Sequence, residues 1–339
     1  MIKKDFKSII GKYIMQYMEY AKPQMAQSSY AHRYSQLLEF DNFLSSIDFS
    51  GTDIDEKIVT AWIHSLSNLS SSTVMTYVVS IRKLFEYLSH MQLMKCYMPH
   101  IKRVTKTYVA HYFTEEELLS IYAYADDYPS GKKNPLPYIK AELPMILRII
   151  ESCGTRLTET LSLQMKHVNL KQGVLTMVHT KKDRERFVPM SNSLTEMLEK
   201  YCLAMGLIGM PDYYIFPKMD FNSHLEKHDI DNRFANILRW NEIMAINRKK
   251  YGRGICPHCF RHNFALKAFK ILENQGISLN DAIPYLSIYL GHDSLQETEK
   301  YLCFSAEMFP DELKSFEETS DNLFPDDDIW NNIYEEIVE

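Results

Sequence analysis

Six side chains between residues 156 and 301 have the chemistry needed to cut and rejoin a phosphodiester. They are Arg156, Lys181, His258, Arg261, His292 and Tyr301. Arginine forks match the non-bridging oxygens of a phosphate and stay charged when water is removed. Histidine and lysine can give or take a proton, and a tyrosine hydroxyl can attack phosphorus and hold it as a phosphotyrosine. Because arginine clamps can stabilise the phosphorane, the set needs no metal ion or other cofactor.

The spacing of these residues is informative only when the motifs are taken together. Arg156 lies in the run Gly-Thr-Arg-Leu-Thr-Glu (154–159), where a helix is expected to begin, and Lys181 lies in a charged hairpin turn. His258 and Arg261 belong to a His-x-x-Arg-His pattern. His292 ends a Leu-Gly-His run (290–292), and Tyr301 follows His292 nine residues later. Each motif alone is weak, whereas all of them in this order are a strong signal.

In this order the motifs resemble those of the tyrosine recombinases, also called phage integrases. The resemblance extends over nearly the whole chain, as far as Tyr301. One departure concerns the hairpin, where the family often has Gly-Lys-Gly and this chain has Thr180-Lys181-Lys182. Lys182 is therefore an alternative to Lys181 as the functional amine.

The resemblance implies a role for each candidate. Arg156 and Arg261 would clamp the scissile phosphate, with His292 supporting it. Lys181 would protonate the leaving 5′-hydroxyl. His258 would accept the proton of the nucleophile, Tyr301. The resemblance also implies a structural role for two further residues, Glu159 near Arg156 and His262 behind the site.

Plainer interpretations exist for the same residues. Arg156 could be an ordinary arginine at a helix start, paired with Glu159, and Tyr301 could be a packing residue. The charged hairpin could be a solvated turn. A zinc site with ligand-like spacing could also be formed by Cys256, His258, Cys259 and His262, but no second Cys-x-x-Cys pair completes it. We therefore predict no metal.

The elements that precede these residues are helical. Apolar residues recur at steps of three and four over residues 28–45, from Asp53 to Leu66, and over 74–88, where hydroxyl residues 70–73 offer an N-cap. No alternating strand pattern interrupts them. The first hundred residues therefore predict an all-helical bundle, which the resemblance would make a SAM-like DNA-binding domain.

The following part predicts a mainly α fold with one small antiparallel sheet. Thr114 and Glu117 form a capping box, and a helix ends near Glu151, with Pro137 and Pro144 limiting where it can start. Residues 168–178 and 186–190 read as strands. Further helices are expected at 193–205, 231–246, 261–272, 281–290 and 295–304.

These patterns divide the chain into four parts. A helical core-DNA-binding domain spans 1–104, a basic linker 105–112, a mixed α/β catalytic domain 113–310, and an acidic tail 311–339. The linker region is a candidate strap on a phosphate backbone, although it could be a solvated connector. Candidate DNA-binding residues are Lys102, Arg103, Lys106, Lys182, Arg184, Arg248, Lys249, Lys250 and Arg253.

The charge of the chain is unevenly distributed. The net charge is -6, which taken alone disfavours nucleic-acid binding. Residues 311–339, however, hold eleven acidic residues and one basic residue, a net of -10, so the other 310 residues carry +4. Residues 329–338 of the tail also place apolar side chains on one helical face. In the resembled family such a segment docks on a neighbouring protomer, and we expect the same here, although it could instead dock on its own domain. The resemblance implies a tetramer on two DNA sites.

Other classes of protein are disfavoured. The sequence has no run of about 18 apolar residues, so no membrane span is predicted. The first twelve residues lack the apolar core of a signal peptide. Six cysteines are too few for a disulfide scaffold. We expect a cytoplasmic protein.

The sequence thus predicts a site-specific DNA recombinase, with duplex DNA and further copies of the chain as partners, and accessory recombinases as additional candidates. The resemblance implies strand exchange through a 3′-phosphotyrosine and a Holliday junction. Mobile-element integration and Xer-like dimer resolution remain alternatives, as do a type IB-like topoisomerase, a non-catalytic DNA-binding regulator and a zinc hydrolase.

Overall fold

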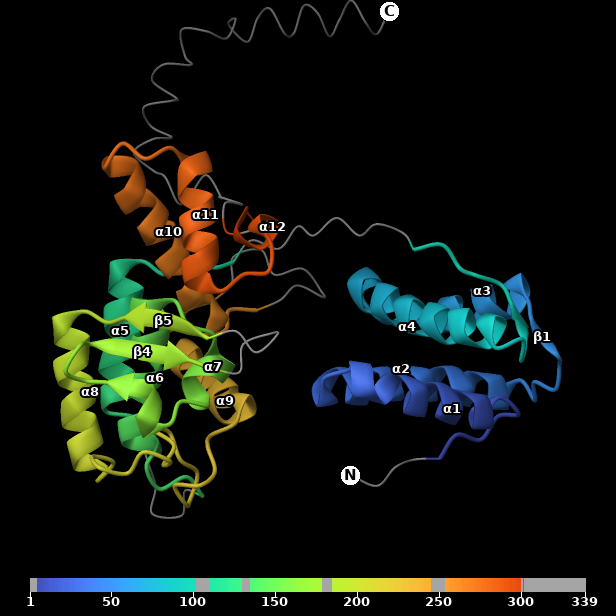
Figure 1. Cartoon of the computed structure of the whole chain (residues 1–339), viewed down its shortest axis with the longest axis horizontal. Coiled ribbons are helices and arrows are strands. Elements are labelled where there is room, and N and C mark those ends of the chain that lie inside the picture. The colour runs from blue at the N-terminus through green and yellow to red at the C-terminus, as the bar shows by residue number, and fades with distance from the viewer. Residues whose placement is uncertain are drawn as a thin grey trace, which may run out of the picture. The chain divides into compact units, whose positions relative to one another are not determined.

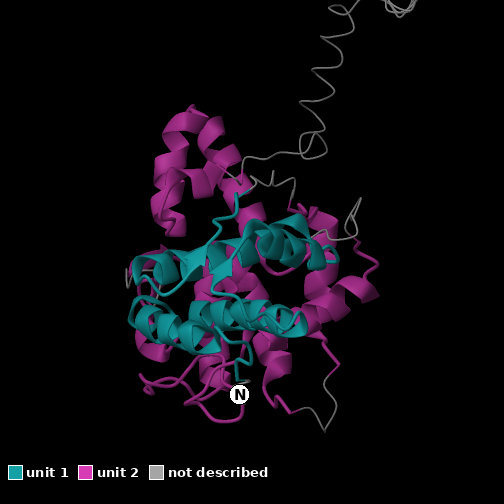
Figure 2. Ribbon diagram, turned by 90° about the vertical axis from the view of Figure 1, so that its right-hand side faces the viewer, with its two compact units in different colours: residues 1–107 teal, residues 108–339 magenta. Residues whose placement is uncertain are grey.

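The structure is a computed structural model of the whole chain. It describes residues 5–101, 110–129, 135–178, 185–244, 254–299 and 301. The chain divides into two compact units, residues 1–107 and 108–339 (Figure 2). Each unit has its own hydrophobic core, and each is described by itself.

The first unit is built from four α-helices in the described residues. They are α1 (Gly11–Ala21), α2 (Gln27–Ser46), α3 (Glu56–Ser65) and α4 (Ser71–His90), with a short 3-10 helix η1 (Lys22–Gln24). Helices α1, α2 and α4 pack alongside one another (Figure 1). The rings of Phe40, Trp62 and Phe85 fill the core, with Phe40 edge-on to both of the others. The helices expected at 28–45 and 74–88 are confirmed.

The expectation of a purely helical first unit is wrong in one detail. Strand β1 (Asp53–Ile54) pairs in parallel with β2 (Lys95–Cys96). The helix predicted from Asp53 begins at Glu56, because Asp55 is extended and its carboxylate accepts from the backbone N–H of Ile58 at 2.9 Å. That N-cap fixes the start of α3.

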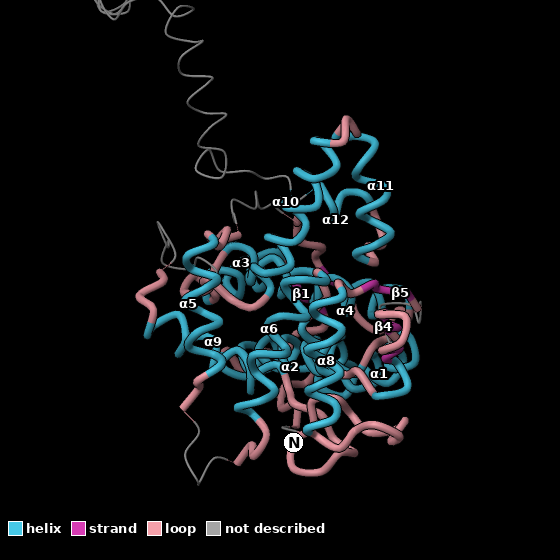
Figure 3. The backbone as a smooth tube through the Cα atoms, turned by 90° about the vertical axis from the view of Figure 1, so that its left-hand side faces the viewer, coloured by secondary structure: helices cyan, strands magenta, loops and turns pink. Residues whose placement is uncertain are grey.

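The second unit surrounds the apolar helix α6 (Ile139–Cys153). This helix contacts α5 (Glu115–Asp126), α7 (Leu157–Leu161), α8 (Asn192–Ala204) and α10 (His258–Asn274), which are labelled in Figure 1. Figure 3 shows that helices make up most of the described chain. The remaining helices are η2 (Met165–His167), α9 (Lys227–Trp240), α11 (Leu279–Leu290) and α12 (Leu295–Glu299). The predicted capping box of Thr114 and Glu117 opens α5.

The predicted small antiparallel sheet is present, with strands β3 (Val168–Asn169), β4 (Val174–Met177) and β5 (Arg186–Pro189) in that order. Leu175 pairs with both Val168 and Val188, so β4 is the central strand. The single strand expected over 168–178 is two strands, because the chain turns between them and Gly173 has a φ of +63°. Positive φ favours glycine.

Several helix boundaries differ from those expected. Pro144 does not limit the start of α6 but lies inside it. Helix α9 begins at Lys227 rather than Asp231, because Asp229 accepts from the backbone N–H of Glu226 at 2.8 Å in a capping box. Helix α10 begins at His258, directly after Pro257, so His258 and Arg261 share one helix. None of the described helices combines the length and the apolar character that a bilayer span requires.

Candidate active site

Four of the six predicted catalytic residues converge in the second unit. Arg156 directly precedes α7, Arg261 lies in α10, and His292 follows α11. Tyr301 lies just beyond α12 and is 7% exposed. The fifth, His258, lies on α10 with its ring 6.5 Å from that of Tyr301. The sixth, Lys181, and its alternative Lys182 fall outside the described residues.

The side chain of Arg261 is at the centre of this cluster and is fully buried. Its Nε donates to the hydroxyl of Tyr301 at 3.1 Å, and its Nη1 donates to the carbonyl of Gly154 at 2.7 Å. Its Nη2 donates to the carbonyl of Leu290 at 2.7 Å and lies 2.9 Å from Nε2 of His292. Burial lowers the pKa of Arg261, but an arginine keeps its proton in proteins. One guanidinium therefore joins the segments that carry the other candidates.

Arg156 is positioned by a glycine turn. Gly154 has a φ of +60° at the end of α6, and a Cβ there would overlap the ring of Phe264, so only glycine fits. The Arg156 side chain is 25% exposed. Its Nη1 donates to Glu159 at 2.7 Å, and its Nη2 donates to the carbonyl of Gly291 at 3.1 Å.

Glu159 is a buried carboxylate that serves two arginines. Besides the side chain of Arg156, its oxygens accept from the Arg156 backbone N–H at 3.0 Å. They also accept hydrogen bonds from both terminal nitrogens of Arg186, at 3.1 and 2.7 Å. Burial alone would raise the pKa of Glu159, but the hydrogen bonds and charges of Arg186 and then Arg156 lower it to about 2.

The contacts of His292 define its tautomer. Arginine can only donate, so Nε2 of His292 accepts from Arg261, and Nδ1 must carry the proton. That proton is donated to the hydroxyl of Thr298, 2.7 Å away. Burial, and then the charges of Arg261, Arg156 and Arg186, lower the pKa of His292 to about 3. His292 is therefore neutral at physiological pH.

The ring of Tyr301 is enclosed by histidines. It stacks on His292 with ring centroids 5.4 Å apart and an interplanar angle of 16°. The ring of His262 lies 4.2 Å away, closer than that of His258. The resemblance places His262 behind the site, whereas in the structure its ring lies against that of the candidate nucleophile, Tyr301.

These residues fall within a match to a known family. The model of the phage integrase family matches residues 111–307, more than half of the chain. The chain belongs to the phage integrase family. This membership confirms the resemblance read from the ordered motifs.

Named relatives in this family are tyrosine recombinases. XerD of Pseudomonas putida is 31% identical over 159 residues, which cover 46% of this chain and 47% of that protein. The chain thus spans about half the length of the first curated relatives that it matches. XerD of Vibrio cholerae is 26% identical over 285 residues, or 81% of this chain and 84% of that protein.

Solved structures of family proteins share the fold. XerH site-specific recombinase bound to a palindromic difH substrate aligns with a TM-score of 0.62 at 18% identity, covering 93% of this chain and 91% of that one. A lambda integrase dimer bound to a COC′ core site aligns with a TM-score of 0.62 at 15% identity, covering 86% and 76%. These likenesses support a mainly α recombinase fold with a small sheet.

Sequence reasoning missed Arg186 in this phage integrase family member. The interpretation of the hairpin as a solvated turn is wrong for this residue, because its side chain is only 11% exposed and is paired with Glu159. The sequence carries no clear signal for it: Arg186 shares one face of β5 with the buried Val188, but the apolar Phe187 between them lies on the other face and is 71% exposed. Thr298, which holds His292, was also missed.

The zinc alternative receives no support from the side-chain geometry. Within the described part of the chain, no three histidine, cysteine or acidic side chains converge on one point. The rings of His258 and His262 meet edge to face at 5.1 Å. All nine candidate DNA-binding residues, from Lys102 to Arg253, fall outside the described residues.

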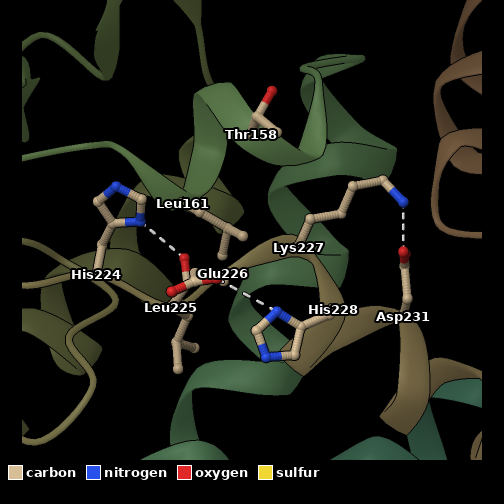
Figure 4. Close-up of a pocket in the computed structure, with 8 residues that line it drawn as sticks. All are labelled: Thr158, Leu161, His224, Leu225, Glu226, Lys227, His228 and Asp231. Carbon is tan, nitrogen blue, oxygen red and sulfur yellow. Dashed lines mark hydrogen bonds and ion pairs between the residues drawn. The ribbon is translucent and has the colours of Figure 1, made fainter. Parts of the chain in front are cut away.

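A hollow between α7 and the start of α9 is distinct from this cluster (Figure 4). Its lining comprises Thr158, Leu161, His224, Leu225, Glu226, Lys227, His228 and Asp231. Lys227 is paired with Asp231, and His228 lies 3.3 Å from Glu226. Because Asp231 and Glu226 lie beside Lys227 and His228, the hollow does not form a strongly basic phosphate site.

Proposed function

We propose that this chain is a site-specific DNA recombinase that cuts and rejoins strands through a 3′-phosphotyrosine. The observation that carries the proposal is the hydrogen bond from Arg261 to the Tyr301 hydroxyl, within a cluster that also contains Arg156 and His292. A nucleophile and arginine donors in one buried site fit phosphoryl transfer, in which positioning and charge stabilisation do most of the work.

The proposed reaction conserves bond energy. The Tyr301 oxygen attacks the scissile phosphorus and forms a P–O bond as the bond to the 5′ oxygen breaks. The proton of Tyr301 passes to His258, and the leaving 5′ oxygen receives a proton from Lys181. Arg156 and Arg261 stabilise the phosphorane charge, and His292 supports the phosphate indirectly by holding Nη2 of Arg261. A 5′-hydroxyl of a partner strand then attacks the phosphotyrosine and returns its proton to Lys181, while the bond to the Tyr301 oxygen breaks and that oxygen takes back its proton from His258. The reaction therefore requires no ATP, and no step in it uses a metal ion.

The proposed partner is duplex DNA, with the chain acting as a tetramer on two sites through residues 311–339. Support for the DNA partner comes from family proteins: the XerH and lambda integrase structures hold their own DNA substrates. The same exchange would integrate or excise a mobile element, or resolve replicon dimers, depending on where the two target sites lie.

The test uses covalent trapping. Nicked suicide duplexes, carrying sequence from either side of the gene itself, are incubated with the full chain and with Tyr301→Phe. We expect a 3′-linked protein–DNA adduct with the native chain and none with Tyr301→Phe. Tyr285→Phe, in which an exposed tyrosine is replaced, is the matched control and should form the adduct normally. Adduct formation by Tyr301→Phe would overturn the assignment of the nucleophile.

A further inference from the structure

Arg186 links three segments that carry the proposed site. It is the first residue of β5, and both of its terminal nitrogens donate to the carboxylate of Glu159. Its side chain also lies against the turn at Gly291, where a Cβ would be 2.9 Å from Nη1 of Arg186. Gly291 has a φ of +66°, and it immediately precedes His292. Arg186 therefore contacts the turn before His292 and the carboxylate that holds Arg156.

The second observation concerns how Arg156 and Arg186 share the two oxygens of the Glu159 carboxylate. Arg186 occupies both oxygens, so the Arg156 side chain makes a single contact through Nη1 and turns Nη2 toward the carbonyl of Gly291. Without Arg186, the Arg156 fork would be free to bind both oxygens of Glu159 in the geometry that such pairs prefer. That arrangement would withdraw Arg156 from a phosphate.

The third observation is the charge balance. Two arginines around one ionised carboxylate leave a net charge of +1, in a region where Glu159 is 6% and Arg186 11% exposed. Removal of Arg186 would leave a neutral Arg156–Glu159 pair. Unscreened charge in a partly buried site has a large effect on a developing phosphorane.

We propose that Arg186 is a positioning residue that keeps Arg156 available and its cluster positively charged for the scissile phosphate. The inference rests on the proposed recombinase function. Arg186 acts through Glu159, Arg156 and the Gly291 turn, and it does not itself bind the phosphate.

The test compares two substrates in single-turnover cleavage of the suicide duplexes. One has the normal scissile phosphodiester, and the other has a methylphosphonate there, which lacks the negative charge. At saturating protein, Arg186→Met should cleave the phosphodiester about 100-fold more slowly than the native chain. On the methylphosphonate the ratio of native to variant rates should fall to within a few-fold of one, because less charge has to be clamped. Arg186→Lys keeps the charge, so its rate of phosphodiester cleavage should lie between those of the native chain and Arg186→Met.

The matched control is Arg148→Met. Arg148 makes a two-pronged ion pair with Asp126, at 2.7 Å for both contacts, on the surface of α5 and α6. Loss of this pair should leave the preference between the substrates unchanged. A native chain that forms no adduct would defeat the proposed function itself. If the native chain is active, the inference alone is overturned by an unchanged Arg186→Met rate, by an equal loss on both substrates, or by Arg186→Lys being no faster than Arg186→Met.

Discussion

At the scale of single residues, Glu142 stands apart from every other carboxylate in the described chain. It lies in α6, is fully buried, and neither of its oxygens has a hydrogen-bond partner in the described structure. Burial raises its pKa to about 9, although the charge of Arg233 opposes the shift. In the folded protein Glu142 is therefore mostly protonated at neutral pH, since a neutral acid costs less to bury than a carboxylate.

This shift predicts a pH-dependent stability with a defined sign. The folded pKa is raised above the unfolded value, so the stabilising contribution is fully present below about pH 4.5 and is lost as the pH rises toward 9. Thermal unfolding at several pH values should show the melting temperature of the native chain falling, relative to Glu142→Gln, as the pH is raised. Parallel melting curves for the two proteins would contradict the assignment.

The sequence predicted the candidate catalytic residues better than the residues that hold them in place. Tyr301, Arg261 and His292 could be placed together because their motifs occur in a fixed order. The pairing of Arg186 with Glu159 joins residues 27 positions apart, and no short motif marks it. The tautomer of His292 likewise depends on Thr298, which only the folded chain brings within 2.7 Å.

At the scale of elements, α10 is tied to the beginning of α5 by one amide. The Asn263 side chain is fully buried, accepts from the backbone N–H of Phe113 at 3.1 Å, and donates to its carbonyl at 3.0 Å. Both groups of Phe113 thus depend on a residue 150 positions away. This bridge holds α10, which carries Arg261, against the segment leading into α5.

We expect Asn263→Ala to lower the free energy of unfolding of the second unit by about 1 to 3 kcal/mol, because two buried backbone groups lose their partner. Urea unfolding followed by circular dichroism measures the change. Asn236→Ala, on the exposed face of α9, is the control and should alter stability by less than about 0.5 kcal/mol. Equal effects of the two substitutions would show that the bridge does not stabilise the unit.

Element boundaries were predictable where local chemistry defines them. A helix start can be predicted from the sequence itself where it carries a capping residue, as at Thr114 with Glu117 or at Ser70. The pairing of β1 with β2 could not be foreseen, because strands of two residues show no alternation and their pairing joins segments 42 residues apart. Tertiary contacts, not local propensity, create such strands.

At the scale of the whole molecule, the division of charge matters more than its sum. The net charge of -6 combines a +4 body with a -10 segment over residues 311–339. That segment, including its apolar stripe, lies outside the described residues, and its proposed docking on a neighbouring protomer remains a prediction. Its acids would repel DNA, which leaves protein as its expected partner.

Deletion of residues 326–339 should therefore leave binding to a single DNA site unchanged and abolish cooperative assembly on paired sites. Electrophoretic titration with one-site and two-site duplexes separates these effects. A full-length variant with Asp326, Asp327 and Asp328 changed to Asn keeps the apolar stripe and should still assemble. Normal recombination by the truncated protein would refute the assembly role.

In the proposed reaction, the hydrogen bond from Arg261 makes the Tyr301 hydroxyl a competitor of the scissile phosphate for the Arg261 guanidinium. A phosphate oxygen that takes the Nε donor of Arg261 has to displace the tyrosine hydroxyl, and a hydrogen bond to a charged group contributes about 1.5 to 3 kcal/mol. In that reaction, part of the DNA-binding energy of the native chain would therefore be used to release the Tyr301 hydroxyl for attack. A variant without that hydroxyl loses the competitor together with the reaction, so DNA affinities measured with Tyr301→Phe overstate those of the native protein.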